Sequence, residues 1–330
     1  MPLAKTATFR QLASFRAVAR LGSVSLAAAE LHLTQPAVSL QIAALEESAR
    51  APLLERTGRG VRLTEAGALL DGYARRILEL WREAGEEMAT LQGVFSGTLR
   101  VGAVTTAEYL LPPLLVSFAN LHSNVKVRLH VENRDEIVRM MAAQEIDLAI
   151  MGRPPAELKT VSAAFARHPM AFLAGPSHPL MAVKRATMTM VSQAHILVRE
   201  RGSGTRATIE RLFKQAGLPL RIGSEMSSNE AIKHMCAAGF GIAFLSLHTC
   251  VLEIEAGLLK LLPMAGNPIE RDWYVMHLAA RQLPQVAAAF EQFLAERGQA
   301  EILLQLGQSG RLRAPRTHSG ATAKKRQAAA

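Results

Sequence analysis

The stretch SVSLAAAELHLTQPAVSLQIAALEE, residues 23–47, carries the clearest structural signal in the N-terminal part of the chain. Alanines and leucines at helical spacing over residues 25–31 predict one short helix, and residues 32–33 interrupt it. Thr34 is a good N-cap for a second helix, and Pro36 lies in the first turn of that helix, where a missing N–H costs nothing. The stretch therefore predicts a helix-turn-helix.

The second helix has one apolar stripe and one face that is free for contacts. Its stripe falls at i, i+4 and i+7 and consists of Val38, Ile42 and Leu45. A DNA recognition helix inserts its first turn into a major groove about 12 Å wide and offers side chains to base edges. The candidate DNA-binding residues here are Thr34, Gln35, Pro36, Ser39 and Leu40. Spacing alone is equally compatible with an ordinary helical hairpin.

The flanking segments make the DNA-binding interpretation more specific. A helical pattern starts at Phe9 and ends near Gly22, and the segment ERTGRGVRLT at 55–64 predicts a β-hairpin with a glycine turn. Three arginines surround this turn and could follow phosphates beside the groove: Arg56, Arg59 and Arg62. Three helices and a basic hairpin predict a winged helix-turn-helix domain over residues 1–64.

Thr64 can cap a long helix that runs to about Leu91. Its apolar residues step by four and three, close to a heptad pattern, over a length of about 40 Å. The pattern predicts a dimer with two recognition helices, because a domain of about 60 residues has nothing against which such a helix could bury its stripe. Residues 65–97 are thus expected to form a linker and dimerisation helix that ends in the hinge GVFSG at 93–97.

From Thr98 onward, short β-branched runs alternate with helical patterns. This order predicts a parallel sheet in the first of two α/β lobes, which together form a hinged clamp with a ligand cleft at the strand ends. The expected domain is 98–298, with lobe 1 at 98–152 and 268–298 and lobe 2 at about 153–267. Residues 299–330 are expected to be a disordered basic tail.

Composition sets limits on the class of protein. The formal net charge is +10, but residues 1–63 carry only eight Lys and Arg against four Asp and Glu, and the tail supplies a further excess, so charge alone is weak support for DNA binding. No apolar run is long enough for a membrane span, and the N-terminus lacks a signal-peptide pattern, so a cytoplasmic protein is expected. The two cysteines and ten histidines show no metal-ligand spacing, and no catalytic motif is present.

Hydroxyl groups gather at predicted starts of helices in both lobes, where free N–H groups bind anions. Across a cleft they could hold a small carboxylate or a phosphate ester, although each could also be an ordinary N-cap. The candidate effector-binding residues are Thr105, Thr106, Ser203, Gly204, Thr205 and Asn229.

Several segments resemble the LysR-type transcriptional regulators. The resemblance rests on LHLTQPAVSLQIAALEE at 31–47, LTEAG at 63–67, the long helix and the two lobes. Within that family, TTAEYLLP at 105–112, RERGSGTR at 199–206 and WYVMH at 273–277 resemble the subgroup that controls Calvin-cycle (RuBisCO) operons, as do DLAIMGRPP at 147–155 and GIAFLSLHT at 241–249.

The resemblance implies a homodimer or homotetramer that binds an inverted-repeat site on double-stranded DNA and activates transcription by RNA polymerase. It implies no cofactor and no enzymatic activity, but an effector such as a phosphorylated metabolite or NADPH. Leu26 replaces a common basic residue, Leu54 replaces a usual phenylalanine, and Arg50–Ala51 replaces a usual Leu-Gly. A LysR-type regulator of another operon, a two-lobed binding protein and a cleft enzyme remain the alternatives.

Overall fold

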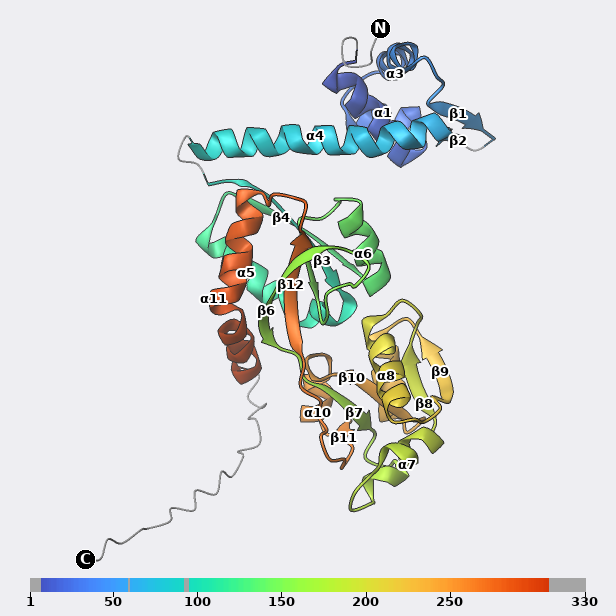
Figure 1. Cartoon of the computed structure of the whole chain (residues 1–330), viewed down its shortest axis with the longest axis vertical. Helices are drawn as coiled ribbons and strands as arrows, with labels where there is room; N and C mark the ends of the chain where they lie inside the picture. The colour runs from blue at the N-terminus through green and yellow to red at the C-terminus, as the bar shows by residue number, and fades with distance from the viewer. Residues whose placement is uncertain (1–6, 59, 92–94, 309–330) are drawn as a thin grey trace, which may run out of the picture.

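The computed structural model describes residues 7–58, 60–91 and 95–308. An N-terminal domain, the long helix α4 (Glu65–Leu91) and a two-lobed α/β domain follow one another along the chain. Figure 1 shows α4 lying between the N-terminal domain and the first of the two lobes. None of the helices within the described ranges is long and apolar enough to span a bilayer.

The N-terminal domain is a winged helix-turn-helix, as the sequence predicts. Its elements are α1 (Phe9–Leu21), α2 (Val24–Glu30), α3 (Gln35–Ala49), β1 (Leu54–Thr57) and β2 (Gly60–Leu63). Gly22 ends α1 in the left-handed conformation with φ 62°, and the Oγ1 atom of Thr34 accepts a hydrogen bond from the backbone of Ala37. Arg50 takes the left-handed conformation at the end of α3, where a glycine is usual, with φ 53°. The buried stripe of α3 packs on α1.

The helix α4 is capped by Thr64, whose Oγ1 atom accepts a hydrogen bond from the backbone N–H of Gly67 at 3.0 Å. A Cβ atom at Gly67 would lie 1.9 Å from the carbonyl oxygen of Leu53, so the helix can approach the N-terminal domain this closely only with glycine there. The expectation that this domain cannot cover the stripe of α4 is wrong in part. Four residues of α4 pack into its core: Ala66, Leu70, Ala74 and Leu78.

A second apolar row of α4 is largely uncovered among the described residues, apart from Trp81, whose ring stacks on Phe9 of α1 with centroids 4.7 Å apart. Large side chains along it are exposed: Leu69, Tyr73, Ile77, Leu80, Trp81 and Met88. A groove of about 680 Å³ lies beside its first half, between α4 and the N-terminal domain, and apolar side chains line most of it.

Lobe 1 is built on a five-stranded sheet in the order β4-β3-β5-β12-β6. The strands are β3 (Gly97–Val104), β4 (Val125–Glu132), β5 (Leu148–Met151), β6 (Thr160–Arg167) and β12 (Asp272–Leu278). β3 runs parallel to β4 and β5, as predicted, whereas β12 runs antiparallel to β5 and β6. The helical elements are η2 (Thr105–Tyr109), α5 (Leu111–Leu121), α6 (Arg134–Ala142) and α11 (Gln285–Gln308).

Two expected boundaries are wrong. The chain does not leave lobe 1 at residue 152, because β6 pairs with β12 inside the lobe 1 sheet and the crossing follows at His168. The tail does not begin at residue 299, because α11 continues to Gln308 and buries Ile302 in the core of lobe 1. Residues 309–330 of the expected tail, and residues 93–94 of the expected hinge, lie outside the described residues.

Lobe 2 has its own five-stranded sheet in the order β11-β7-β10-β8-β9. The strands are β7 (Met170–Ala174), β8 (Ile196–Arg199), β9 (Ile222–Met226), β10 (Ile242–Ser246) and β11 (Lys260–Leu261). The helical elements are η3 (Pro179–Met181), α7 (Met188–Gln193), α8 (Gly204–Gln215), α9 (Asn229–Ala237), η4 (Leu247–Thr249) and α10 (Val251–Glu255). Separate apolar clusters fill the two faces of this sheet.

Candidate functional site

The exposed end of α3 carries the predicted DNA-reading residues. Thr34, Gln35, Pro36, Ser39 and Leu40 are all exposed, while Val38 and Ile42 on the opposite face are buried. The side-chain amide of Gln35 donates a hydrogen bond to Ser25 Oγ, which ties the starts of α2 and α3 together. This helix end therefore presents a polar first turn on a rigid base, which suits insertion into a groove.

The hairpin next to α3 carries part of the predicted basic charge. Arg56 and Arg62 are exposed on β1 and β2, and Arg59 lies outside the described residues. Arg62 faces Glu55 across the hairpin, with 2.8 Å between Nε and Oε1. This cross-strand acid offsets one of the three positive charges, which sequence spacing did not indicate.

A cleft opens between the two lobes and brings together five of the six predicted effector residues. Thr105 and Thr106 reach it from η2 in lobe 1, and Ser203, Gly204 and Thr205 reach it from the start of α8 in lobe 2. The hydroxyl of Ser203 does not cap α8, so the first backbone N–H groups of this helix are free for an anion.

Asn229 does not line the cleft. Its side chain is buried, and its Oδ1 atom accepts a hydrogen bond from Arg199 Nη1 at 2.6 Å. The same Nη1 atom donates to Thr105 Oγ1 at 3.1 Å across the two lobes. Asn229 therefore supports Arg199, and Arg199 fixes Thr105.

Four arginines also line the cleft, and the sequence analysis did not single them out: Arg134, Arg153, Arg211 and Arg271. No Asp or Glu is among the lining residues, and no ion pair in the described ranges joins Arg153, Arg211 or Arg271 to a carboxylate. Burial and the charges of Arg211 and Arg153 lower the pKa of Arg271. Uncompensated arginines in a cleft favour a bound anion.

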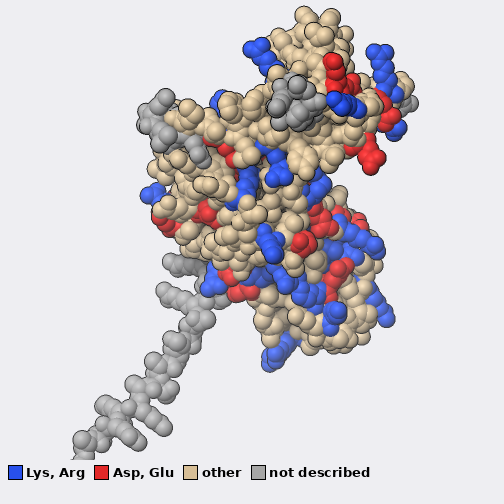
Figure 2. Space-filling model, turned by 45° about the horizontal axis from the view of Figure 1, so that its top comes forward, with Lys and Arg blue, Asp and Glu red and all other residues tan. Residues whose placement is uncertain are grey.

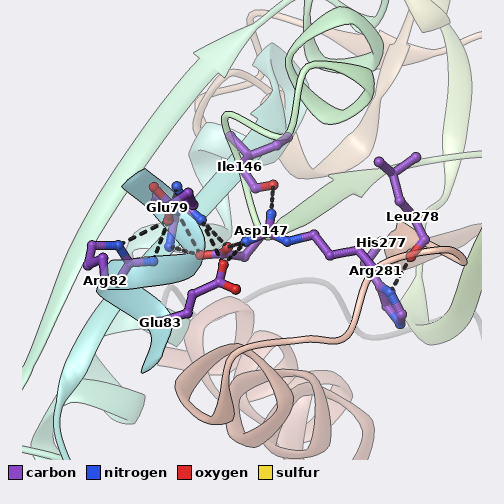
Figure 3. Close-up of polar contacts among 9 residues, drawn as sticks. Glu79, Arg82, Glu83, Ile146, Asp147, His277, Leu278 and Arg281 are labelled. Carbon is purple, nitrogen blue, oxygen red and sulfur yellow. Dashed lines mark hydrogen bonds and ion pairs between the residues drawn. The ribbon is translucent and has the colours of Figure 1, made fainter. Parts of the chain in front are cut away.

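A cluster of charged side chains joins α4 to lobe 1, and we call it the helix–lobe ion cluster: Glu79, Glu83, Arg100, Asp147 and Arg281. Figure 3 labels Glu79, Glu83, Asp147 and Arg281 of this cluster. Asp147 accepts hydrogen bonds from Arg100 Nη2 at 2.6 Å and from Arg281 Nη2 at 2.9 Å. Arg281 also bonds Glu83, and Arg100 bonds Glu79. The cluster couples the orientation of α4 to the lobe that contributes half of the cleft.

Figure 2 shows Lys and Arg side chains gathered over the two-lobed domain on one face, with Asp and Glu side chains among them.

A winged helix-turn-helix, a connecting helix and a two-lobed module with a cationic cleft define a DNA-binding regulator that carries its own ligand-binding domain.

Comparisons with known proteins identify the family. The model of the bacterial regulatory helix-turn-helix protein, lysR family, matches residues 9–68, and the model of the LysR substrate binding domain matches residues 92–299. The RuBisCO operon transcriptional regulator of Allochromatium vinosum is 39% identical over 87% of this chain and 95% of that protein. The chain belongs to the LysR family of transcriptional regulators, a family of DNA-binding proteins rather than enzymes.

Two solved structures are similar to this chain. The regulatory domain of CcmR from Synechocystis PCC6803, in complex with 2-PG, is 36% identical, covers 61% of this chain and 97% of its own, and gives a TM-score of 0.58. Full-length CbnR complexed with its target DNA is 26% identical, covers 88% of this chain and 99% of its own, and gives a TM-score of 0.64.

Proposed function

We propose that this regulator controls a CO2-fixation (RuBisCO) operon in the cytoplasm, in response to a small phosphorylated metabolite that binds between its lobes. The observation that carries the ligand class is the set of arginines in the cleft without carboxylate partners, next to the free N-terminus of α8. The operon is proposed from the likeness to the regulator of Allochromatium vinosum. CcmR supports the ligand class because its regulatory domain was solved with 2-PG.

DNA binding in this proposal uses the exposed start of α3 and the hairpin. Thr34, Gln35, Pro36, Ser39 and Leu40 enter the major groove, and Arg56, Arg59 and Arg62 lie near the phosphates. The uncovered row of α4 and its groove support a homodimer in which the α4 helix of a second copy covers this face. Two copies suit an inverted-repeat promoter site, and pairing of dimers gives the proposed homotetramer, which acts on RNA polymerase.

The ligand proposal is tested by calorimetric titration of the full chain with 2-phosphoglycolate, which carries one phosphate and one carboxylate group. Arg211→Gln removes one cleft charge, and we expect at least a tenfold loss of affinity because a charged hydrogen bond contributes about 1.5–3 kcal/mol. Arg128→Gln is the matched control, because Arg128 is exposed on β4 and does not line the cleft. Equal affinities for the two variants would contradict the proposed site.

The operon proposal is tested by footprinting the promoter region of RuBisCO genes with and without the same compound. We expect a protected inverted repeat whose pattern changes when the compound is added. Protection should weaken steeply as salt is raised, because several phosphate contacts release counterions. A complete lack of protection at low salt would refute the proposed target.

A further inference from the structure

The first strand crossing between the lobes carries a buried histidine that the proposed function does not yet use. His168 lies between β6 and β7, and its backbone N–H donates to the carbonyl oxygen of Arg271 on the return crossing at 2.7 Å. His168 is only 3% exposed, and it lines the cleft together with Gly152 and Arg271. The ring therefore sits at the hinge and at the wall of the ligand site.

Both ring nitrogens of His168 lack a hydrogen-bond partner among the described residues. Buried polar atoms are nearly always paired, because an unpaired one loses its hydration without compensation. The ring is held flat against Trp273, with ring centroids 3.7 Å apart and planes at 14°. Stacking thus fixes the plane of the imidazole but leaves both nitrogens unused.

The neighbours of His168 have their own partners and do not compete for its nitrogens. Trp273 Nε1 donates to His248 Nδ1 at 3.1 Å, so the indole N–H is engaged by His248 and not by the imidazole of His168 on which the indole stacks. Arg271 donates to Thr208 Oγ1 at 2.7 Å and to the carbonyl oxygen of Gly152 at 2.9 Å. A Cβ atom at Gly152 would lie 2.9 Å from His168 Nδ1, so a glycine at this position leaves the room that the imidazole needs beside the cleft.

We propose that His168 is a ligand-contacting residue, in which one ring nitrogen donates a hydrogen bond to a phosphoryl oxygen of the metabolite while Arg271 contacts the same group. This inference rests on the proposed function. A phosphoryl group has enough acceptor oxygens to satisfy both residues at once, and its negative charge offsets the cluster that Arg271 forms with Arg153 and Arg211. His168 would thereby favour phosphorylated ligands over uncharged ligands of similar size.

Three variants separate hydrogen bonding from packing. His168→Phe keeps a flat ring against Trp273 and removes both nitrogens, whereas His168→Asn and His168→Gln each place an amide nitrogen near one of the two ring positions. His122→Phe is the control, since His122 also packs on aromatic rings, Phe95 and Phe118, and lies outside the cleft. Calorimetry with 2-phosphoglycolate and with inorganic phosphate measures affinity for each full-length variant.

We expect His168→Phe to lower the affinity for both compounds about tenfold or more, and one of the two amide variants to recover most of it. His122→Phe should bind as the wild type does. In a Trp81→Phe background only Trp273 remains of the two tryptophans, and its emission should change on ligand binding because it stacks on His168. Thermal unfolding and ligand-free promoter binding show whether each variant is folded.

The outcomes distinguish this inference from the proposed function. If the wild type binds 2-phosphoglycolate and His168→Phe binds it within twofold, the role of His168 is refuted while the ligand class stands. If the wild type binds neither compound, the proposed ligand class fails, and the role of His168 fails with it. If no amide variant recovers affinity, the loss in His168→Phe reflects packing, and the hydrogen-bond assignment is overturned.

Discussion

From the helix–lobe ion cluster we predict that ion pairs, rather than apolar packing, hold α4 on lobe 1. Arg281→Met removes the guanidinium that bonds Glu83, Asp147 and the carbonyl oxygen of Ile146 (Figure 3). Asp147 keeps Arg100 at 2.6 Å, whereas the nearest remaining cation to Glu83 in the cluster is Arg100 at 3.7 Å. The variant therefore leaves one carboxylate poorly paired in a site where the side chain of Glu83 is only 13% exposed.

Removing one partner of a buried ion pair lowers the free energy of unfolding by about 3–5 kcal/mol. Because Glu83 keeps some exposure, we expect Arg281→Met to lower it by about 3 kcal/mol, near the lower end of this range. Glu83→Gln in the same chain neutralises the carboxylate that Arg281→Met leaves behind. The free energy of unfolding of the double variant should therefore fall by less than the sum of the decreases in the two single variants, and the difference gives a coupling energy of about 1–2 kcal/mol.

The assay is urea unfolding of the full chain in a Trp81→Phe background, followed by the emission of Trp273 in the core of lobe 1, for the parent chain, both single variants and the double variant. Arg139→Met is the control, because the Arg139 side chain is 52% exposed and its pairs with Glu136 and Glu145 are solvent-screened. The coupling should persist at high salt because the cluster is buried. A coupling energy below about 0.5 kcal/mol would refute the reasoning.

Three further predictions concern DNA reading, the effector and pH. Gln35→Ala should weaken specific promoter binding by about 1–3 kcal/mol in a gel-shift assay, and an equal loss on random DNA would show that Gln35 does not read bases. Thr205→Ala should reduce the ligand-induced change in the footprint and leave ligand-free DNA binding intact; an unchanged ligand response would count against the cleft. Burial lowers the pKa of His248 to about 4, so the folded chain keeps it neutral while the unfolded chain protonates it near pH 6.5. Protonation of His248 alone should lower the free energy of unfolding by about 1.4 kcal/mol per pH unit from pH 6.5 toward pH 4, and His248→Asn should reduce the slope measured by urea unfolding at several pH values by that amount; an unchanged slope would contradict the reasoning.

The local features of the fold could be predicted from the sequence because they depend on spacing along a few turns. Thr34 and Pro36 mark the start of α3, and the stripe from Val38 to Leu45 marks the face that is buried. The same reasoning located hydroxyl residues at the cleft, since the start of α8 follows directly from RERGSGTR. A helix start needs only its own neighbours in the chain, so a single sequence suffices to find it.

The rest depended on contacts between distant segments. β6 belongs to lobe 1 because it pairs with β12, which lies more than a hundred residues later, and no local pattern states that partner. The charge of the cleft comes from Arg153, Arg211 and Arg271, each isolated in the sequence and brought together only when both crossings pair at the hinge. Burial acts in the same way: the exposed or paired state of an arginine or a histidine is set by what the fold places against it, and only the tertiary structure supplies that surrounding.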